Sequence, residues 1–516
     1  MRGKKLIFVL MPILNSIASW FMKKRMHQIE LFMKYPQDVQ DEWMRKLLKT
    51  ARETEFGRKH NFGGIENYDQ FKRNVPLQDY ESLKPSIERI RKGDQNVLWP
   101  TETKWFAKSS GTTDKSKFLP ITKESLDGCH YNGGRDSITL HCVNNPETQL
   151  FTGKILTLGG SRQSNFVGNH ESFQGDVSAI VLENLPMWAE HFRAPDIEIA
   201  LLDKWEEKLD KIARATMNEN VTSVSGVPSW MLVLLRIILD YKKASSIKEV
   251  WPNLEVYFHG GVSFTPYKDQ FRKIFDNDSV RYTQVYNASE GFFGIQDLPG
   301  VNDMLLMLDY GVFYEFIPLS ELQNENPRAY TIGEVNTETV YAMVISTNAG
   351  LWRYQLGDTI KFTSTSPYRF EIVGRTKHHI NVFGEELMIH NAEQALRVAC
   401  EKTHAQITEY TAAPVFMDES HGAHEWIIEF EKEPNNLDYF ADVLDKTLKT
   451  LNSDYEAKRY NDYVLHFPIV KSVGKGTFYK WLSAKNKLGG QAKVPRLSNE
   501  RTFVEEVLKS GRDFVY

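Results

Sequence analysis

The segment WFAKSSGTTDKSK, residues 105–117, is the stretch on which the predicted fold depends, because a short apolar run there ends in a turn of hydroxyls and glycine. The same pattern recurs at two later positions, where apolar runs end in the pairs Gly159-Gly160 and Gly260-Gly261. Segments with helical periodicity lie between them, over 205–217 and 230–239. A strand that ends in a glycine turn is typical of an α/β protein. We therefore expect an α/β region whose strand ends carry loops available for a ligand.

The sequence after Gly374-Arg375 has a different texture and predicts a second, smaller folding unit. Its expected elements are a helix over 392–403, two strands over 413–417 and 426–430, and a long helix over 436–452. This mixture is α+β, and a length of about 140 residues is ordinary for a domain. We therefore predict an N-terminal segment over 1–25, a large domain over 26–375 and a small C-terminal domain over 376–516.

Length and composition exclude several classes of protein. The 516 residues are 41% apolar and 25% charged, as in an ordinary folded protein of more than one domain. The 63 basic and 67 acidic residues give a net charge of -4 with interspersed signs, so no nucleic-acid partner is expected. Three cysteines are too few for a disulfide framework and suit a reducing compartment.

The N-terminus supports two interpretations. Basic residues at 2–5 and the apolar run from Leu6 to Leu14 have the pattern of a signal peptide. Apolar side chains also recur every three or four residues from Ile13 to Met33, through the small-residue site Ser16-Ile17-Ala18 where cleavage would occur. We favour an uncleaved amphipathic helix in a cytoplasmic protein, packed on the body or in peripheral contact with a membrane.

The turn within 109–117 is the strongest local signal for ligand binding. Its hydroxyls, glycine-freed backbone amides and two lysines offer many donors to a polyphosphate. A solvated hydrophilic loop explains the same composition equally well. The chain contains neither the G-x-x-x-x-G-K-[ST] loop nor the G-x-S-x-G motif, so ordinary P-loop ATPases and serine hydrolases lose support.

Three further segments carry candidate ligand-binding groups. Tyr286 to Gly291 sets Ser289 beside Glu290, whose hard oxygens suit Mg²⁺, although a helix N-cap is an alternative. Trp352 to Asp358 ends in an aspartate that can accept both ribose hydroxyls, although a type I or II turn is an alternative. Val373-Gly374-Arg375 offers a guanidinium that either binds phosphate or pairs with a surface carboxylate.

The order of these segments resembles that of the adenylate-forming enzymes: a phosphate turn, His259-Gly260-Gly261, Tyr-x-x-Ser-Glu, Tyr-x-x-Gly-Asp, Gly-Arg and a lysine near the C-terminus. Within that superfamily the chain resembles the auxin-responsive acyl-acid amido synthetases, known as the Gretchen Hagen three family. This resemblance rests on Ser-Ser-Gly-Thr-Thr with Lys117 and Pro120, on Tyr-x-x-Ser-Glu before Phe-Phe-Gly, and on Arg-Tyr-Gln-Leu-Gly-Asp. It covers the chain from about Met26 to the end. It implies a large adenylate-forming domain of β-sheets with flanking helices, and a smaller, mobile α+β C-terminal domain.

The resemblance also implies ATP and Mg²⁺ as ligands and gives roles to matching positions. The implied nucleotide-binding residues are Ser109, Ser110, Gly111, Thr112, Thr113, Lys117, Gly260, Gly261, Tyr286, Ser289, Asp358 and Arg375. Among them the 109–113 turn would hold the phosphates, Gly260-Gly261 would lie against the adenine with Tyr286 as an aromatic wall, and Asp358 would clamp the ribose. The implied catalytic residues are Glu290, Arg375 and Lys493, with Glu290 as the magnesium ligand and Lys493 in a Gln-x-Lys-x-Pro-Arg segment.

Two positions depart from the family's pattern. Asp114-Lys115 stands where the family commonly has a glycine, which puts a negative charge beside the polyphosphate unless Lys115 or Lys117 offsets it. Gly384-Glu385-Glu386-Leu387 replaces the Asp-Lys-Thr of the plant enzymes, so this chain supplies no lysine there. Around it, Gly-Arg-x-x-x-x-Ile-Asn-Val-x-Gly-Glu is closer to the general adenylate-forming hinge.

The implied reaction is ATP-dependent adenylation of a carboxylic acid, followed by transfer of the acyl group to the amine of an amino acid. Adenylation supplies a good leaving group, so the protein needs alignment and positive charge rather than a covalent nucleophile. Rotation of the C-terminal domain about Arg375 and Thr376 would change which face of that domain, the lysine-bearing or the acceptor-binding one, covers the nucleotide pocket. Two alternatives stay open, a thiol acceptor such as coenzyme A and a non-catalytic nucleotide-binding or membrane-peripheral protein. The sequence does not identify the acid, the acceptor or the oligomeric state.

Overall fold

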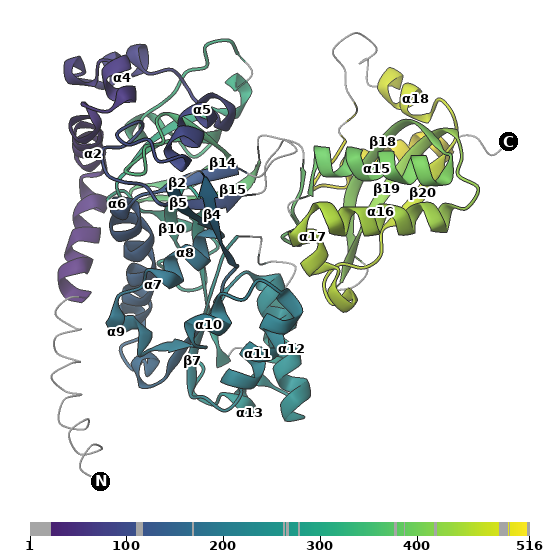
Figure 1. The fold of residues 1–516 in the computed structure, drawn as a ribbon, viewed down its shortest axis with the longest axis horizontal. Helices are drawn as coiled ribbons and strands as arrows, with labels where there is room; N and C mark the ends of the chain where they lie inside the picture. The colour runs from purple at the N-terminus through teal and green to yellow at the C-terminus, as the bar shows by residue number, and fades with distance from the viewer. Residues whose placement is uncertain are drawn as a thin grey trace.

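The computed structural model describes residues 22–109, 117–167, 170–261, 264, 268–276, 279–322, 324–375, 379–385, 387–416, 421–484, 494 and 496–512. These residues form a large body and a smaller C-terminal body, which stand side by side (Figure 1). The large body contains two sheets, and the smaller body contains one three-stranded sheet with its own helices. This arrangement confirms the predicted fold class, a large α/β region followed by a smaller α+β unit.

Among the described residues, eleven strands form one sheet in the order β12-β13-β14-β15-β11-β10-β9-β8-β7-β3-β6. In that order their bounds are Val312–Pro318, Val340–Thr347, Tyr354–Thr365, Tyr368–Arg375, Met304–Leu306, Gly291–Ile295, Arg281–Ala288, Val256–His259, Val221–Gly226, Lys154–Leu158 and Arg193–Ala194. The pairs from β6 to β9 are parallel, and those from β9 to β12 are antiparallel. The sheet therefore changes character at β9, the strand that carries the Tyr286 motif.

Helices cover the parallel half of this sheet. Helix α11 (Trp205–Thr216) buries Leu209, Ile212 and Ala213, which recur at the spacing of one helical face. Helix α12 (Pro228–Lys242) begins with proline at its first turn and is apolar nearly all round. Both helices confirm the predictions over 205–217 and 230–239. The shorter helices of this half are α8 (Val177–Glu183), α9 (Met187–Glu190), α10 (Ile197–Ala200), α13 (Ile247–Val250) and α14 (Lys268–Ile274).

A second sheet of the large body carries the strand that leads into the predicted phosphate turn. Its order is β2-β1-β5-β4, with bounds Lys117–Ile121, Trp105–Ser109, His170–Gly175 and Arg162–Val167. Strands β1 and β2 are antiparallel, and their last pair is Ser109 with Lys117. Strand β5 runs parallel to β1 and pairs Gly175 with Ala107. The residues on either side of 110–116 are therefore paired at one end of this sheet.

The N-terminal helices pack on the antiparallel half of the large sheet and on strand β2 of the second sheet. They comprise a helix over 22–34 and the helices α2 (Pro36–Ala51), α3 (Glu55–Lys59), α4 (Tyr68–Asn74) and α5 (Tyr80–Arg91), followed along the chain by α6 (Lys123–Ser125) and α7 (Tyr131–Asn144). Ile29 and Phe32 of the first helix are fully buried. The predicted amphipathic helix over 13–33 is thus helical and packed on the body from residue 22, and residues 1–21 lie outside the described chain.

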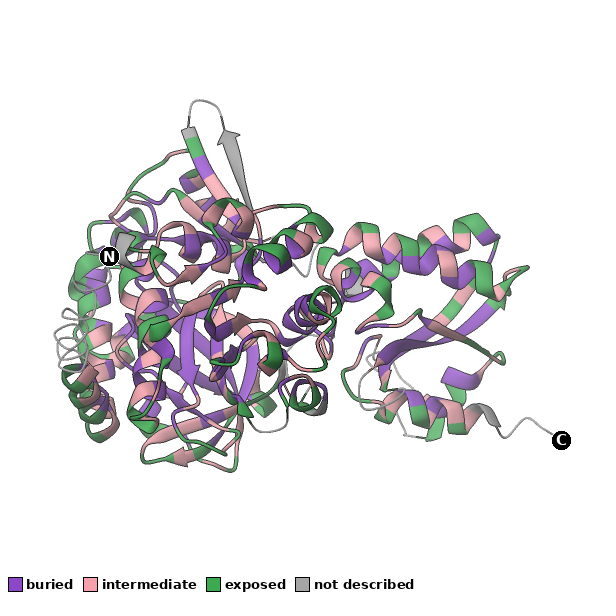
Figure 2. Ribbon diagram, turned by 90° about the horizontal axis from the view of Figure 1, so that it is seen from below, coloured by how far each residue is buried: buried purple, intermediate pink, exposed green. Residues whose placement is uncertain are grey.

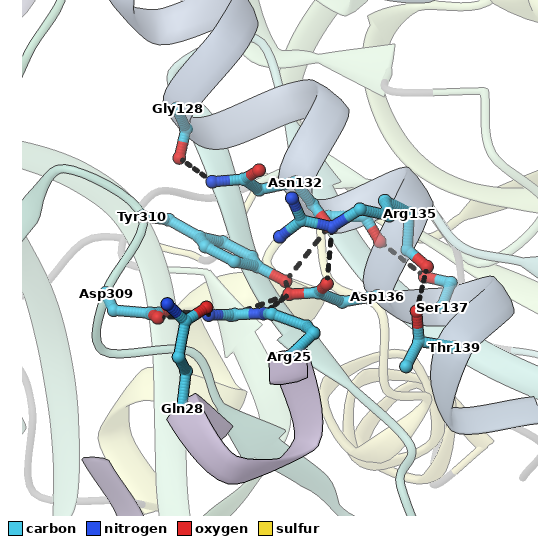
Figure 3. A network of polar contacts seen from close by, with 11 residues as sticks. Arg25, Gln28, Gly128, Asn132, Arg135, Asp136, Ser137, Thr139, Asp309 and Tyr310 are labelled. Carbon is cyan, nitrogen blue, oxygen red and sulfur yellow. Dashed lines mark hydrogen bonds and ion pairs between the residues drawn. The ribbon is translucent and has the colours of Figure 1, made fainter. Parts of the chain in front are cut away.

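Arg25 anchors that first helix through a buried polar network (Figure 3). Its Nε donates to Asp136 Oδ2 at 2.7 Å, and its Nη2 donates to Asp309 Oδ1 at 2.9 Å. Tyr310 Oη donates to the same Asp136 oxygen at 2.7 Å. Three distant segments thus meet at one buried carboxylate. The predicted boundary at residue 25 falls inside this helix, and the division into domains stays a prediction.

The C-terminal body is a sheet of order β18-β19-β20 with helices on both faces. Its strands span Gln406–Phe416, Gly422–Lys432 and Ile469–Val473, and its helices are α15 (Ile389–Thr403), α16 (Leu437–Leu451), α17 (Ser453–Lys458), α18 (Thr477–Ala484) and α19 (Thr502–Arg512). A two-stranded ribbon, β16 (His379–Ile380) and β17 (Leu387–Met388), precedes it. Trp426 and Ile428 pack on the side of α16, whereas Ile427 between them packs with α18 and α19. Figure 2 shows these strands as buried between helices with exposed outer faces.

Candidate active site

The carboxyl ends of the parallel strands open on one cavity of about 2960 Å³. Leu158, Gly226 and His259, the last residues of β3, β7 and β8, all line it. Parallel strands present their carboxyl ends at the same edge of a sheet, where ligands of α/β proteins commonly bind. Asn452 and Lys458 of the C-terminal body also line this cavity, which therefore extends between the two bodies.

The motif from Tyr286 to Glu290 forms the end of β9 and the turn into β10. Ser289 and Glu290 are the turn residues, and both are half-buried and line the cavity. Ala288 and Gly291 pair across this hairpin. The alternative of a helix N-cap at Ser289 is wrong, because the chain continues from the turn into a strand. The hairpin instead brings a carboxylate to the cavity wall.

Asp358 lies in strand β14, next to a bulge. Along β13 the pairing advances by two residues, from 342 to 344, while along β14 it covers four, from 355 to 359. Gly357, inside the bulge, has φ +94°, a left-handed conformation that favours glycine. Bulges commonly re-aim a side chain beside an active site, and Asp358 lines the cavity. The alternative of a type I or II turn at Asp358 is wrong, because Asp358 belongs to a paired strand.

Tyr286 and Asp358 meet although their strands are not neighbours in the sheet. Tyr286 Oη donates a hydrogen bond to Asp358 Oδ2, and the two residues are 6% and 8% exposed. Strands β10, β11 and β15 lie between β9 and β14. Four strand spacings in a flat sheet would separate them by about 19 Å. The sheet is therefore curled. The curl brings the segment that contains Tyr286 into contact with the segment that contains Asp358.

Arg375 and Asp358 are opposed in the register of β15 and β14. The predicted hinge arginine and the predicted ribose clamp thus occupy facing positions on neighbouring strands. The structure describes the backbone of Arg375, and Thr376 of the predicted hinge lies outside the described residues. The roles assigned to Arg375 stay predictions.

The predicted phosphate turn begins where β1 ends, at Ser109, whose backbone is described. Ser110, Gly111, Thr112 and Thr113, like Lys493 near the C-terminus, lie outside the described residues. Of the lysines that flank the turn, Lys108 lines the cavity, whereas the Lys117 ammonium stands 5.8 Å from the centre of the Tyr80 ring. The phosphate-binding assignments therefore stay predictions.

Gly260 and Gly261 both line the cavity at the end of β8. A Cβ on Gly260 would lie 2.3 Å from the carbonyl oxygen of Val285, so this glycine allows the close approach of β9. Gly261 has φ +82°, which a residue with a side chain rarely adopts. The backbone thus explains both glycines, and their contact with adenine stays a prediction.

Two buried histidines of the cavity wall were not predicted as site residues. His130 Nδ1 lies 3.2 Å from Asn287 Oδ1, within the second motif, and His259 stacks on Phe264 with ring centroids 4.0 Å apart. Burial lowers the pKa of His130 to about 4 and that of His259 to about 3. Both imidazoles are therefore neutral at physiological pH. No local pattern marks His130, because its partner lies 157 residues away.

Lys208 is a second kind of residue that sequence reasoning missed. It is 1% exposed, and its Nζ donates to the carbonyls of Gly159 and Gly160 at 2.6 and 2.7 Å. Burial lowers the pKa of Lys208 to about 8. The lysine holds the turn at the end of β3. Asp176 holds the same turn, because its Oδ2 accepts from the Ser161 amide at 2.8 Å. Lys208 lies on the apolar face of the 205–217 helix, and this position in the sequence already indicated that it would be buried.

Cations of each body lie against rings of the other at their junction. Lys458 of α17 is 1% exposed, and its Nζ lies 4.6 Å from the centre of the Trp230 ring, in the first turn of α12. Arg236 of α12 lies over the Tyr463 ring and donates to its carbonyl at 3.1 Å. These contacts set the C-terminal body against the carboxyl edge of the parallel strands.

Comparison with solved structures shows that other proteins share this architecture. The GH3.15 acyl acid amido synthetase matches with a TM-score of 0.60 and 18% identity over 95% of both chains. A 2-hydroxyisobutyryl-CoA ligase in complex with 2-HIB-AMP and CoA matches with a TM-score of 0.57 and 13% identity over 93% of both chains. Both likenesses show the fold, and they confirm the predicted fold class.

Sequence profiles then identify the family. Those of the GH3 family N-terminal, central and C-terminal domains match residues 25–280, 305–375 and 390–502. The chain belongs to the GH3 family, as the motif order predicted. Among curated relatives, the probable indole-3-acetic acid-amido synthetase GH3.1 of Arabidopsis thaliana is 23% identical over 93% of this chain and 92% of its own length. The jasmonoyl-L-amino acid synthetase JAR4 of Nicotiana attenuata is 24% identical over 91% and 92%.

Within the described residues, no helix is long and apolar enough to cross a membrane.

Proposed function

We propose that this chain is an ATP-dependent acyl-acid amido synthetase, which adenylates a carboxylic acid and transfers the acyl group to the amine of an amino acid. The observation that carries the proposal is the convergence of Glu290, Tyr286 and Asp358 on one cavity at the carboxyl edge of the sheet. Membership of a family whose curated relatives are amido synthetases supports it. The acid is a small molecule, and a cytoplasmic location fits the need for ATP.

The first step is attack of the acid's carboxylate on the α-phosphorus of ATP, with loss of pyrophosphate. Asp358 accepts hydrogen bonds from the ribose hydroxyls and so fixes the nucleotide in the cavity. The 109–113 turn and Lys117 hold the phosphates, and Arg375 supplies positive charge opposite Asp358. These groups act by alignment and charge stabilisation, so the cavity needs no covalent nucleophile.

Mg²⁺ fits the donor set that the cavity offers. Glu290 is a half-buried carboxylate in a hairpin turn of the cavity wall, with the Ser289 hydroxyl beside it. Magnesium in nucleotide sites commonly takes one or two carboxylates and completes its shell with water and phosphate. Glu290 would hold the ion, which would neutralise charge on the phosphates as pyrophosphate leaves.

The second step brings the acceptor to the acyl adenylate. The cavity reaches between the two bodies, so a rotation of the C-terminal body changes which of its residues face the carboxyl edge of the sheet. Lys493 would act in one of these arrangements. A thiol acceptor is the second candidate, because a CoA ligase shares the fold over 93% of both chains.

Pyrophosphate exchange tests the proposal. Purified protein is incubated with ATP, Mg²⁺, labelled pyrophosphate and a panel of aryl, indolyl and fatty acids. Exchange that depends on one acid supports adenylation, whereas ATP binding without exchange across the panel supports the non-catalytic alternative. With the active acid in hand, mass spectrometry of reactions with amino acids or coenzyme A distinguishes an amide from a thioester.

Two variants tie the activity to the cavity. Glu290→Gln and Asp358→Ala should each lower exchange at least about a hundredfold, because each removes a charged group from the reacting nucleotide. Glu371→Gln is the matched control, since Glu371 also lines the cavity but belongs to none of the motifs. Near-normal exchange in both site variants would contradict the assignment.

A further inference from the structure

Exposed apolar side chains of both bodies line the cavity. Among the described residues, twelve large apolar side chains are exposed, and four of them line this cavity: Leu298, Ile372, Val373 and Phe416. The first three belong to the large body, and Phe416 ends β18 of the C-terminal body. Apolar side chains that are exposed together mark a place where something binds. The two bodies thus both offer apolar surface to one space.

The end of strand β15 is uncovered on both faces. Ile372 and Val373 are consecutive in this strand and are 39% and 47% exposed. Successive strand residues point to opposite faces, so neither face is covered at this point. Strand β11 pairs antiparallel with β15, so the loop that leads into β11 lies beside the end of β15, and Leu298 of that loop also lines the cavity. We call Leu298, Ile372 and Val373 the β15 patch.

The β15 patch is close to the proposed nucleotide site. Arg375, which opposes Asp358, follows Ile372 by three residues in the same strand. Three residues of a strand span about 10 Å. The patch therefore continues the cavity wall beyond the proposed ribose-binding position. A nucleophile bound against it has a short path to an acyl adenylate in the cavity.

The C-terminal body adds its own apolar surface to the cavity. Phe416 is 50% exposed, and its ring packs against Phe383 with centroids 5.5 Å apart. Val382, next to Phe383 in the sequence, lines the cavity as well. Among the described residues that this body contributes to the cavity wall, Lys458 is the cation, and it is buried, whereas Asp454 adds a carboxylate. This wall therefore suits an apolar group better than an anionic one.

We infer that the acceptor is an amino acid with an apolar side chain, which binds against the β15 patch and Phe416. The inference rests on the proposed function, because it takes an amine as the second nucleophile. It names the class of acceptor that the sequence leaves open. The neutral amine nitrogen attacks the acyl carbon, the bond from that carbon to the AMP oxygen breaks so that AMP leaves with the electron pair, and the nitrogen gives a proton to water.

Acceptor specificity in the second step tests the inference. The full chain is supplied with ATP, Mg²⁺ and the acid that drives pyrophosphate exchange, and then with leucine, phenylalanine, glycine, aspartate or coenzyme A. Amide formation is measured by mass spectrometry. We expect kcat/KM for leucine or phenylalanine to exceed that for glycine by at least about tenfold, because the apolar walls remove the side chain from water. Aspartate should be used less well than glycine, since its side chain is charged.

Two variants tie this preference to the apolar residues. Ile372→Ser and Phe416→Ser should each lower kcat/KM for leucine about tenfold, because each replaces an apolar contact with a hydroxyl. Both should leave kcat/KM for glycine and the rate of pyrophosphate exchange within about twofold of the wild type. Substitutions of exposed side chains rarely unfold a protein, so both variants are expected to fold. Ile372→Lys should raise the use of aspartate relative to leucine, because it places a cation in the patch.

Leu319→Ser and Tyr439→Ser are the matched controls. Both side chains are exposed and apolar, one on each body, and neither lines the cavity. Both variants should keep the wild-type preference for leucine over glycine.

The outcomes separate this inference from the proposed function. A wild type that prefers aspartate or coenzyme A overturns the inference and leaves adenylation intact. An equal loss with leucine and glycine in Ile372→Ser also overturns it, because the patch would then be an interface that the C-terminal body covers when it rotates. Absence of exchange with every acid contradicts the proposed function, and the inference with it.

Discussion

Arg353 and Asp358 belong to one short motif, yet the structure puts them to opposite uses. Asp358 lines the cavity and accepts from Tyr286. Arg353 is 5% exposed and forms a buried ion pair with Glu315, Nη2 to Oε1 at 2.8 Å, while its Nη1 donates to the Val75 carbonyl at 2.8 Å. One end of the motif thus anchors the core, and the other lies at the cavity wall, where we propose that it binds the ribose. A motif residue need not touch the ligand to be required by the site.

Breaking the Arg353 anchor should have the largest effect on stability. Glu315→Ala leaves a buried guanidinium without its carboxylate, a change that typically costs about 3 to 5 kcal/mol in the free energy of unfolding. Urea denaturation followed by circular dichroism measures it. Pyrophosphate exchange per folded molecule should change less than tenfold.

Glu321→Ala is the control for this experiment, since Glu321 forms its ion pair with Arg328 on the surface. Surface pairs contribute little, so its unfolding free energy should lie within about 1 kcal/mol of the wild type. An equally small loss in Glu315→Ala would contradict the anchoring role of Arg353.

Breaking the other end of the motif should spare stability and remove activity. Asp358→Asn keeps the size of the side chain and removes its charge, so the ribose loses a charged acceptor. We expect a fall of about a hundredfold in pyrophosphate exchange, which corresponds to about 2.7 kcal/mol. The urea midpoint should stay close to that of the wild type. A variant that unfolds as easily as Glu315→Ala would show that both ends are structural.

Acid pH should weaken the cavity wall through His130, the partner of Asn287. The pKa of His130 is about 4 in the folded chain, against a usual value of 6.5. Between these values the unfolded state binds a proton that the folded state does not, so stability falls as the pH drops below 6.5. At pH 5 the loss from this residue is about 2 kcal/mol.

Urea denaturation of the wild type and of His130→Gln at pH 7 and pH 5 measures that loss. The variant cannot take up the proton, so its stability should fall less between the two pH values. Identical pH dependence in both proteins would contradict the assignment. His259, with a pKa of about 3, should contribute in the same direction.

The smallest effect is expected at the junction of the two bodies, where Lys458 lies over Trp230. A cation over an aromatic ring contributes about 1 kcal/mol, which corresponds to a factor of about five in an opening equilibrium. Trp230→Leu should raise the rate of tryptic cleavage at Arg375 and Lys377 by about that factor. Tyr241→Phe on the exposed part of α12 is the control and should leave the rate unchanged. An unchanged cleavage rate in Trp230→Leu would show that the contact between Lys458 and Trp230 does not stabilise the junction.

The sequence alone predicts the local elements and the order of the motifs. Short apolar runs before glycine pairs became β3 and β8, and helical periodicity over 205–217 became α11, because these signals depend on neighbours along the chain. The motif order identified the family for the same reason. The sequence could not decide whether Ser289 begins a helix or lies in a hairpin turn. Serine followed by glutamate is compatible with both local structures.

The tertiary structure alone decides which of these residues meet. Tyr286 and Asp358 are 72 residues and four strand positions apart, and only the curl of the sheet closes that distance. His130 with Asn287, and Arg353 with Glu315, likewise join segments that no local pattern relates. Chemistry at each position is a property of the sequence. Long-range packing decides which side chains contact each other, and whether a motif residue faces the cavity or the core. Local periodicity along the chain does not encode this packing.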